Sequence, residues 1–461
     1  MPDWSNVDAS TATLRIPDPR MQFLYDAAIR TVTLLSADEI VPGPYTYRRF
    51  WFRDACIMMN TMLAVGMAAR CRRAIEKFPS RQLRNGYFRS QEGEWDSNGQ
   101  VLWILDRYET VTGESLGIAI NDAAMKAVNW IAKKREPQAE GVLHAGLLPP
   151  GFSAEHLGPN DYYYWDDYWA VAGLQAAERL FLRAGRTATA ASARREADDM
   201  QAAIERSVRA IPRRRSLGGI PASPYRRLDS GAVGSLVADY PLQLMPAGDA
   251  RIMATVEGLL RTSFHNGGFF QEIIHSGINA YLTLDVAQTL LRAGDARYRQ
   301  LVETVAAIAS PTGQWPEAIH PLSGGGCMGD GQHGWAAAEW LMMMRNMFVR
   351  EEGDRLVVGS GVFADWVDEL ESGADLYFGP TATPWGPVSV KITRDGDEAL
   401  VTVTGTWRRQ APRIDVFLPS WGAALDVAAG EPIRIARGGR MDWSDGKQSH
   451  DVAERVERMT P

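Results

Sequence analysis

The sequence of 461 residues contains only three cysteines, Cys56, Cys71 and Cys327, and they are widely spaced. Their number and spacing exclude a disulfide framework and offer no zinc-binding pattern. The first residues lack the basic and apolar stretches of a secretory signal, and no run approaches the roughly 18 consecutive apolar residues of a membrane span. We therefore expect a cytoplasmic protein that does not enter a membrane.

An excess of positive charge is also lacking. Lys and Arg number 49 against 56 Asp and Glu, which gives a net charge of −7 and a pI near 5.6. Nucleic-acid binding needs a basic face, so we predict no nucleic-acid partner. The short run Arg213-Arg214-Arg215 lies between predicted helices and is typical of a solvated loop. No feature indicates an oligomeric state.

The patterns of metal and nucleotide sites are missing as well. His144, His156, His320 and His333 lie in predicted loops, but none forms a pair at the spacing of a helical zinc motif. The glycine-rich segment 323–331 lacks the Lys-Ser/Thr ending of a P-loop, and no Gly-x-Ser-x-Gly nucleophile turn occurs. We expect no metal and no cofactor, and we interpret the histidines as structural or sugar-binding.

Aromatic residues are abundant, with 15 Trp and 14 Tyr. Many stand beside Asp, Glu, Gly or Pro rather than inside apolar runs, as in the segment 162–169, Tyr-Tyr-Tyr-Trp-Asp-Asp-Tyr-Trp. Aromatic rings next to carboxylates in loops suit ligands with apolar faces and hydroxyl edges. The sequence therefore favours an oligosaccharide or glycoside as the partner.

Up to about residue 353 apolar residues recur at steps of three and four, as in amphipathic helices. The predicted helices span 21–36, 54–78, 99–112, 118–134, 168–183, 187–210, 230–240, 249–263, 279–293, 296–308 and 334–350. Gly113, Gly185, Gly294 and Gly353 each follow a predicted helix end and precede a charged residue, a common way to stop a helix. Their separations, roughly 60 to 70 residues or somewhat less than twice that, indicate a helical-hairpin repeat.

Paired helices of this number predict a mainly α fold, an (α/α)6 toroid barrel over residues 1–354. A solenoid is the alternative, but the long loops rich in glycine, proline and aromatic residues favour a closed barrel with a lined mouth. Beyond it, segments 388–394 and 399–407 alternate apolar and polar residues around Arg-Asp-Gly-Asp, which predicts a β-hairpin. Segments 413–418 and 432–436 resemble further strands. We predict a small β-rich, sandwich-like module over residues 355–461.

Two loops that precede predicted helices carry candidate binding residues. Trp51, Arg53 and Asp54 stand before the second helix, where Asp54 also suits the helix dipole. Trp95 and Asp96 precede the helix at 99–112, where Asp96 fits an N-cap. Capping and sugar binding are compatible, so both roles stay open for these positions.

The third loop places two adjacent carboxylates among aromatic rings, in Tyr164-Trp165-Asp166-Asp167. Apolar surroundings and a neighbouring like charge should raise the pKa of one of them. A raised pKa is what a general acid needs near neutral pH. The alternative is a capping pair that faces solvent.

The fourth loop contains Glu317 between Pro316 and Pro321, which predicts a restricted, extended backbone. A carboxylate held on a rigid loop suits a general base that must position one water molecule. The alternative is a surface glutamate in an ordinary turn. The candidate substrate-binding residues around this loop are Trp315, His320, His333 and Trp335.

These motifs together resemble the six-hairpin (α/α)6-barrel glycosidases, nearest to their glucoamylase-like branch, over most of residues 20–370. Trp51-Phe52-Arg53-Asp54 resembles the Trp-x-Arg-Asp motif, whose Arg and Asp bind hydroxyls of the terminal sugar. Gly146-Leu147-Leu148-Pro149 is similar to a Gly-Leu-hydrophobic-Pro loop. Trp165-Asp166-Asp167 is similar to Trp-Glu-Glu, in which the first carboxylate is the general acid and the second contacts substrate. The resemblance makes Glu317 the general base, and His333-Gly334-Trp335-Ala336 is similar to the helix start that follows it.

The resemblance implies a glycoside hydrolase that inverts configuration, with Asp166 or Asp167 as acid and Glu317 as base. Two departures stand out: Asp replaces Glu twice in the acid motif, and the β-rich module follows the barrel instead of preceding it. A phosphorylase remains an alternative, as does a sugar epimerase that uses His320 and His333. A non-catalytic saccharide-binding protein is the third alternative.

Overall fold

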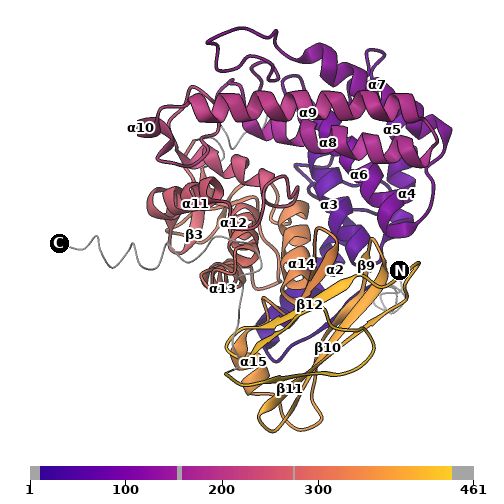
Figure 1. The fold of residues 1–461 in the computed structure, drawn as a ribbon. Coiled ribbons are helices and arrows are strands. Elements are labelled where there is room, and N and C mark those ends of the chain that lie inside the picture. Colours follow the sequence, from indigo (N-terminus) through magenta and orange to yellow (C-terminus); the bar gives the residue numbers. More distant parts are fainter. Residues whose placement is uncertain (1–10, 153–157, 274–275, 439–461) are drawn as a thin grey trace.

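The computed structural model describes residues 11–152, 158–273 and 276–438. Figure 1 shows helices in the larger part of the molecule and a β-rich part at one end of it. In the described ranges, no helix is long and apolar enough to cross a membrane.

Six helices form an inner ring that closes on itself. Around the ring each packs on the next, and the last packs on the first. In this order the inner helices are α3 (Phe52–Ala64), α6 (Ser97–Thr112), α8 (Tyr164–Arg183), the 3-10 helix η2 (Ser230–Ala238), α12 (Ala280–Arg292) and α14 (Gly334–Phe348). The closed ring excludes the solenoid alternative.

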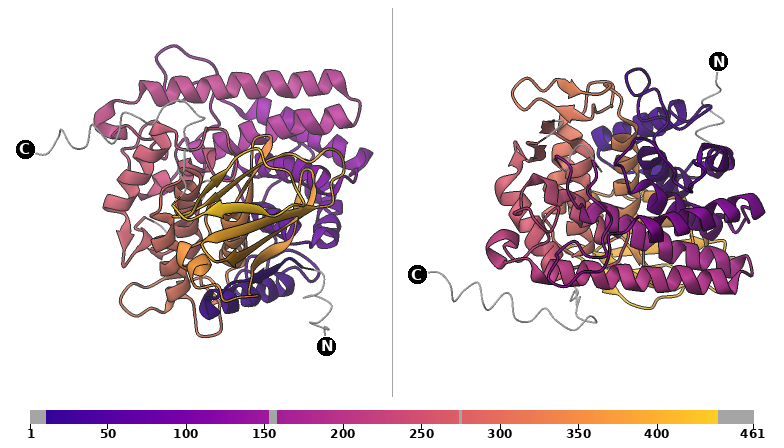
Figure 2. Two further views of the ribbon diagram at one scale, coloured as in Figure 1. Left: turned by 60° about the horizontal axis from the view of Figure 1, so that its bottom comes forward. Right: turned by 90° about the horizontal axis from the view of Figure 1, so that it is seen from above.

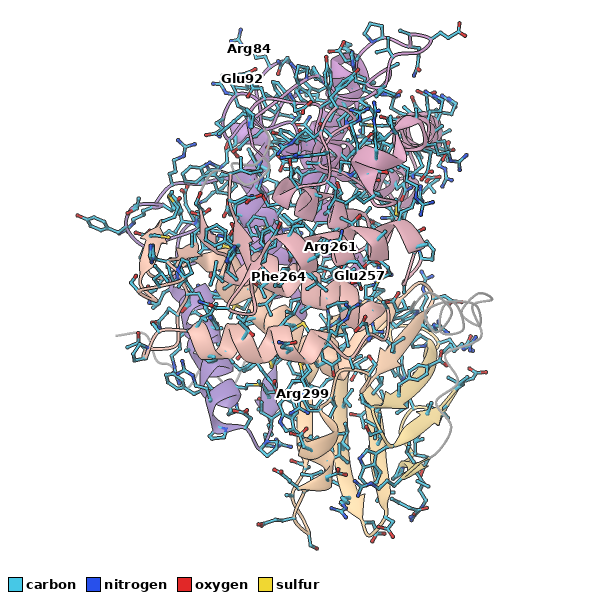
Figure 3. All side chains as sticks on the ribbon, turned by 90° about the vertical axis from the view of Figure 1, so that its left-hand side faces the viewer. Arg84, Glu92, Glu257, Arg261, Phe264 and Arg299 are labelled. Carbon is cyan, nitrogen blue, oxygen red and sulfur yellow. The ribbon has the colours of Figure 1, made fainter. Side chains whose placement is uncertain are left out.

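Each of the first five inner helices packs against the outer helix that follows it in the chain, and α14 packs against the first outer helix, α2. The outer helices are α4 (Ala68–Glu76), α7 (Ile118–Lys134), α9 (Thr187–Ala210), α11 (Ala250–Thr262), α13 (Tyr298–Ile308) and α2 (Pro19–Leu34). They are amphipathic: Glu257 and Arg261 of α11 and Arg299 of α13 lie on the outward side in Figure 3. The predicted (α/α)6 toroid is therefore confirmed, and Figure 2 shows it from two further sides. Three short helices, α5 (Phe78–Arg81), α10 (Arg213–Ser216) and α15 (Ala364–Asp368), complete the set.

The inner helices run in the same direction. Near their beginnings, Arg53 of α3 pairs with Asp96 in front of α6, at 2.7 Å between Nε and Oδ2. Near their ends, Arg107 of α6 donates through Nε to Oδ1 of Asn60 on α3, at 3.2 Å. The starts of α8, α14 and α12 join the first end, because Trp165 bonds to Asp96 and contacts Trp335, which contacts Tyr281. Asp239, at the end of η2, pairs with Arg292 at the end of α12. All inner helices therefore begin at one end of the barrel, called here the mouth end, and finish at the other, called the basal end.

Two glycines let α6 and α8 come very close. A Cβ atom on Gly99 would lie 2.2 Å from the carbonyl oxygen of Trp169, and one on Gly173 would lie 2.4 Å from the carbonyl oxygen of Gly99. No side chain fits between these backbones, so only glycine permits this approach. The pair fixes the spacing of the two helices that carry most of the mouth-end carboxylates.

Four glycines were predicted to end helices, and three of them do. Gly113, Gly185 and Gly294 have the predicted left-handed conformation after α6, α8 and α12. Gly353 does not end a helix: α14 stops at Phe348, and Gly353 forms the turn between two strands. That prediction was wrong because a left-handed glycine suits a hairpin turn as well as a helix end.

The single helix predicted over 54–78 was also wrong. It is split into α3 and α4 at Gly66, which has φ 96°. The amide of Met67 then bonds to the carbonyl of Met62 at 2.7 Å, which closes the end of α3 and turns the chain into its outer partner. The segment 230–240, predicted as an α-helix, is the 3-10 helix η2.

Two sheets build the β-rich part. One has the order β1 (Thr13–Arg15), β9 (Leu376–Thr383), β10 (Gly386–Asp395), β11 (Glu398–Gly405) and β14 (Ile433–Ala436). The other has the order β13 (Gly422–Ala424), β12 (Arg413–Leu418), β8 (Arg355–Val358) and β7 (Val349–Glu352). The predicted hairpin is confirmed: β10 and β11 pair antiparallel, with Asp395 opposite Glu398. The predicted barrel ended at residue 354, but strand β7 of the β-rich part already starts at Val349. Strand β1, near the beginning of the chain, also belongs to this part.

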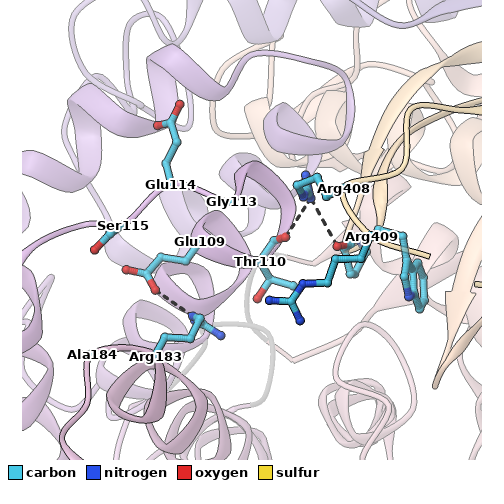
Figure 4. Close-up of a pocket in the computed structure, with 11 residues that line it drawn as sticks. Glu109, Thr110, Gly113, Glu114, Ser115, Arg183, Ala184, Arg408 and Arg409 are labelled. Carbon is cyan, nitrogen blue, oxygen red and sulfur yellow. Dashed lines mark hydrogen bonds and ion pairs between the residues drawn. The ribbon is translucent and has the colours of Figure 1, made fainter. Parts of the chain in front are cut away.

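The β-rich part packs on the basal end of the barrel, where β9 contacts α3, α6 and α14. Arg408, after β11, fixes this contact because its guanidinium donates to the carbonyls of Thr110 (3.0 Å) and Val111 (2.7 Å) at the end of α6. Figure 4 shows this arginine beside α6. It satisfies carbonyl groups that the helix end leaves without an intrahelical partner.

A third, small sheet lies in the loops of the mouth end. Its strands are β2 (Phe264–His265), β3 (Gly268–Gln271), β4 (Gly277–Ile278), β5 (Ala318–Ile319) and β6 (Gly326–Met328), in this order. The sheet joins the loop after α11 to the loop after α13. It therefore supports the segment that carries Glu317.

Candidate active site

The mouth end gathers predicted site residues from four inner helices. They stand at or beside the first residue of each helix: Arg53 and Asp54 on α3, Asp96 before α6, Trp165, Asp166 and Asp167 on α8, and His333 and Trp335 at α14. These residues gather at one end because the inner helices are parallel, so that all the loops leading into them lie at that end.

Asp96 connects three inner helices. Its Oδ2 accepts from Nε of Arg53 and from the indole N–H of Trp165, both at 2.7 Å, and from Gln100 at 3.1 Å. It stands at the N-cap of α6, but its side chain makes no capping hydrogen bond. The capping role that the sequence allowed is therefore wrong, and the carboxylate acts as the buried ion-pair partner of Arg53. Glu94 lies near the same guanidinium, at 3.6 Å.

Asp166 and Asp167 lie in the first turn of α8, which begins four residues earlier than predicted. Both are buried, so neither is a capping residue that faces solvent. Asp166 acts electrostatically on Tyr87: burial raises the pKa of that phenol, and the negative charges of Asp96, Glu94, Glu92 and Asp166 raise it further. Asp166 thus belongs to the same charged neighbourhood as Asp96.

Asp167 points into a different environment. Its Oδ1 accepts from the backbone N–H of Leu148 at 2.9 Å, while its Oδ2 is buried and makes no hydrogen bond to any residue that the structure describes. Burial raises its pKa to about 7, against the opposing effects of the Leu148 N–H and of Arg135. This contact explains the position of the Gly-Leu-Leu-Pro loop, which is anchored on α8 through Asp167.

Glu317 stands directly before β5 and is held from two sides. The side chain of Asn279, before α12, donates to its backbone carbonyl at 2.7 Å. The hydroxyl of Tyr47 donates to its Oε2 at 2.6 Å. Only 5% of Glu317 is exposed, so the surface-turn alternative is wrong.

Asp330 fixes the loop that carries Tyr47. Its carboxylate accepts from the backbone N–H groups of Tyr45 (3.1 Å), Thr46 (2.7 Å) and Tyr47 (3.0 Å). These bonds outweigh the effect of burial and lower the pKa of Asp330, so it remains ionised at neutral pH. The glycine-rich segment around Asp330 thus supports the Tyr47 loop and does not form a phosphate cradle.

A continuous row of aromatic rings runs from Glu317 to the α8 carboxylates. The ring of Tyr47 lies 6.5 Å from that of His333, and Tyr281 lies 5.0 Å from His333 and 4.7 Å from Trp335. Trp335 in turn lies 6.3 Å from Trp165, the neighbour of Asp166. The row links the two predicted catalytic segments, although they are far apart in the sequence.

Two further predicted residues lie beside this row. His333 approaches Asp54, with Nε2 4.0 Å from Oδ1. Trp51 is half-buried, contacts Tyr47 edge to face at 5.9 Å and carries the guanidinium of Arg49 on its face at 3.8 Å. Both Asp54 and Trp51 retain exposed surface, unlike Arg53.

Other predicted binding residues have the contacts of packing residues. Trp95 packs beside the stacked rings of Tyr87 and Trp130, and the Tyr164 hydroxyl pairs with Ser207 of α9 at 2.7 Å. Trp315 donates to the carbonyl of Val305 at 2.9 Å and is buried. His320 is exposed in a turn, where its Nδ1 accepts from the backbone of Leu322 and Ser323. His156 lies outside the described residues.

Sequence reasoning missed Asn279, Tyr281, Asp330 and the role of Tyr47. Asn279 and Tyr281 stand at the start of a predicted helix, as the predicted site residues of α3, α6, α8 and α14 do. The same signal, a polar or aromatic residue at a helix start, was therefore present there. Asp330 had no such signal because its importance comes from contact with a loop 285 residues away. Tyr47 lay in a recognised aromatic loop, but nothing in the sequence connects it to Glu317.

No protein-family model matches the chain, and the search of curated proteins also gives no match. Solved structures do match. A GH78 family rhamnosidase of Bacillus sp. GL1 is 14% identical with a TM-score of 0.63, over 89% of this chain and 43% of that one. A bacterial glucoamylase complexed with acarbose is 14% identical with a TM-score of 0.54, over 69% and 55%.

A metal-independent α-mannosidase of Streptococcus pneumoniae, in complex with α-1,6-mannobiose, is 16% identical with a TM-score of 0.54, over 71% and 94% of the two chains. The chain spans only about half the length of the glucoamylase it matches. These likenesses confirm the fold: the chain has the glucoamylase-like, six-hairpin (α/α)6 architecture with a β-rich module.

Proposed function

We propose that the chain is a glycoside hydrolase that cleaves an oligosaccharide or glycoconjugate with inversion of configuration. Asp166 is the general acid and Glu317 the general base. The observation that carries the proposal is the row of aromatic rings at the mouth end, which runs from Tyr47, the hydrogen-bond partner of Glu317, to Trp165, the neighbour of Asp166.

Glu317 meets the requirements of a base. A phenol that donates to a carboxylate stabilises its ionised form, and Tyr47 does so at 2.6 Å. The Asn279 bond and strand β5 hold the backbone of Glu317, so the carboxylate stays in a fixed position. A fixed, ionised carboxylate can orient one water molecule and take its proton.

We assign Asp166, rather than Asp167, as the acid. Asp166 is buried at the start of α8, directly after Trp165 of the aromatic row, and it matches the first carboxylate of the Trp-Glu-Glu motif. Asp167 is engaged with Leu148, which makes it a positioning residue.

The row of rings suits a sugar. Beside the row, Trp51 offers a partly exposed, flat apolar face, and Asp54 offers a partly exposed carboxylate for hydroxyl groups. Arg53 is 4% exposed and bound to Asp96, so we assign it to positioning Asp96 and the start of α3. The glycosidases of the same fold, described with acarbose and mannobiose, support a saccharide substrate.

The epimerase alternative loses its support. An acid–base pair of His320 and His333 would require both imidazoles at one substrate, but His320 is in an exposed turn and His333 is buried among Tyr47, Tyr281 and Asp54.

The test is turnover of a panel of oligosaccharides and aryl glycosides, with the anomer of the first product followed by NMR. We expect cleavage in the absence of phosphate and a first product of the opposite anomeric configuration. Cleavage only with added phosphate would indicate a phosphorylase, and a retained configuration would contradict the water-activating role of Glu317. Saccharide binding without turnover over the whole panel would indicate a binding protein.

A further inference from the structure

The segment that joins α9 to η2 lies at the rim of the mouth end. Only three residues separate α8 from α9, so α9 runs back toward the mouth end and finishes there at Ala210. The carbonyl of Ala222 accepts from the backbone N–H of Tyr164, at the start of α8, at 3.0 Å. The segment 211–229 therefore belongs to the same end of the barrel as Asp166.

This segment carries four arginines, called here the rim arginines: Arg213, Arg214, Arg215 and Arg227. The first three lie in the short helix α10, at the end of α9 in Figure 1, where a solvated loop was predicted. Folding brings Arg227 beside them, because the amide of Leu228 bonds to the carbonyl of Arg215 at 2.9 Å. Arg215 also donates to the carbonyl of Tyr225 at 3.0 Å. The four arginines therefore stand on one stretch of the surface.

The rim arginines form a local excess of positive charge. Three of them, Arg213, Arg214 and Arg227, are exposed, and none of the four forms an ion pair with a carboxylate among the described residues. The next residue in the chain differs, since Arg226 pairs with Asp229 at 2.7 Å. The ends of α9 and α10 favour a nearby cation by only about 0.3–1 kcal/mol each. In a chain with a net charge of −7, this surface is suited to attract anions from solution.

Partly exposed aromatic rings adjoin these arginines. Tyr225 is 44% exposed, and its hydroxyl lies 2.6 Å from Nδ1 of His144. The imidazole of His144 is stacked on the ring of Tyr162, with the centroids 4.0 Å apart and the planes at 11°. Tyr162 lies 5.9 Å from Tyr225, so the three rings form one group, called here the ring cluster. Because Tyr162 stands just before α8, the ring cluster lies on the rim beside the start of that helix.

The two features together describe a ligand. Flat, partly exposed rings suit the apolar faces of sugar rings. Guanidinium groups form strong hydrogen bonds with carboxylates and similar oxyanions. A sugar chain that carries acidic groups uses both features. A neutral glycan uses only the ring cluster, and a polyanion without sugar rings uses only the rim arginines.

We propose that the rim selects acidic oligosaccharides as substrates. The sugar units beyond the cleaved bond carry carboxylate or sulfate groups, which the rim arginines bind while the ring cluster packs on the sugar faces. This inference rests on the proposed function, because it names the substrate class of that hydrolase. The charges of the rim also act through solvent, over about 8–10 Å at ordinary ionic strength, so they draw such a substrate toward the mouth end.

The first experiment measures binding by calorimetry in the Glu317→Gln background, where the proposed hydrolysis does not consume the ligand. The probes are an oligogalacturonate and its uncharged methyl ester, a sulfated dextran oligosaccharide and plain dextran of equal length, and poly-L-glutamate. We expect at least one acidic oligosaccharide to bind at least tenfold more tightly than its neutral counterpart and than polyglutamate. Equal binding of the neutral counterpart would remove the need for charge, and equal binding of polyglutamate would remove the sugar recognition. Failure of both acidic oligosaccharides to bind would also overturn the proposal.

Variants in the same background assign the site. The triple variant Arg213→Gln/Arg214→Gln/Arg227→Gln should weaken binding of the acidic oligosaccharide at least tenfold. The matched control, Arg30→Gln/Arg195→Gln/Arg409→Gln, removes the same charge from exposed arginines elsewhere and should stay within twofold of its parent. Unchanged binding in the rim variant would place the ligand elsewhere, and equal losses in both variants would reduce the effect to net charge. Either result contradicts the proposal. All six arginines are exposed, so both variants should keep the melting temperature of the parent.

Turnover by the wild type separates this proposal from the proposed function. Cleavage of neutral glycosides without any preference for acidic ones would refute the selection by the rim and leave the hydrolase standing. Selective binding of acidic oligosaccharides without turnover of any glycoside would support the rim site and refute the hydrolase.

Discussion

The two ends of the barrel are built from the same helices, but their buried carboxyl groups have pKa values shifted in opposite directions. At the mouth end, burial raises the pKa of Asp167 to about 7. At the basal end, Glu351 is also largely removed from solvent, with 15% of its side chain exposed, but the charges of Arg345 and Arg107 outweigh the effect of burial and lower its pKa to about 2. The difference teaches that depth alone does not decide the protonation of a carboxyl group.

Helix direction contributes to this division. The inner helices start at the mouth end, where partial positive charge tolerates carboxylates, and finish at the basal end, where partial negative charge tolerates arginines. The carboxylates that the proposed reaction needs and the arginines of the basal ion pairs therefore fit the ends at which they stand. We expect substitutions at the mouth end to change turnover most and substitutions at the basal end to change stability most.

The largest effect on turnover is expected for Glu317→Gln. The amide keeps the shape of the side chain but cannot accept a proton from water, so kcat should fall by about 100- to 10,000-fold, the usual contribution of acid–base catalysis. Binding of a substrate analogue, measured by calorimetry, should remain within a few-fold of wild type. Turnover within tenfold of wild type would remove Glu317 from the mechanism.

The largest effect on stability is expected at the basal end, for Arg345→Met. Its guanidinium is 3% exposed and makes two bonds to Glu351, so its removal leaves a buried carboxylate without its main partner. Such losses cost about 3–5 kcal/mol, measurable by urea unfolding. The matched control Arg194→Met, at an exposed pair, should cost less than about 1 kcal/mol. Equal losses of stability for the two variants would contradict the larger contribution that we assign to the buried ion pair.

A smaller, pH-dependent effect is expected for Asp167→Asn. The pKa of Asp167 in the folded state, about 7, lies above its ordinary value of 3.8, so the folded protein binds the proton more tightly than the unfolded chain. The stability gained from this proton is fully present below about pH 4 and is lost as the pH rises to about 7. Asn at this position does not titrate.

The melting temperature of Asp167→Asn should therefore rise relative to wild type between about pH 5 and about pH 8. A difference that stays constant over this range would show that Asp167 is not protonated in the folded state. The comparison between variant and wild type cancels the titration of other buried groups.

Much of the fold could be predicted because it depends on local signals. Gly113, Gly185 and Gly294 end helices where the sequence indicates, and the loops before the inner helices carry the polar and aromatic residues of the mouth end. The failures at Gly66 and Gly353 have one cause. A left-handed glycine can end a helix, join two helices or turn a hairpin, and only the pairing of the flanking residues decides among these roles.

The candidate site was predictable in composition but not in its contacts. The Tyr47 hydroxyl reaches Glu317 across 270 positions of the sequence, and no local pattern encodes that bond. Trp95 and Trp165 stand in similar aromatic–acidic segments, yet one ring packs on the outer helix α7 and the other bonds to Asp96. Which way such a ring points depends on the packing of helices that are distant in sequence.

The most direct test of the acid–base assignment is the leaving-group dependence of Asp166→Asn, with Asp167→Asn as the matched control. A glycoside with an alkyl or sugar leaving group needs a proton on the departing oxygen, whereas a dinitrophenolate departs without one. We predict that Asp166→Asn loses at least 100-fold in kcat/KM on the first substrate and less than tenfold on the second, while Asp167→Asn affects both equally. Equal losses on both substrates in Asp166→Asn, or the selective loss in Asp167→Asn, would contradict the assignment.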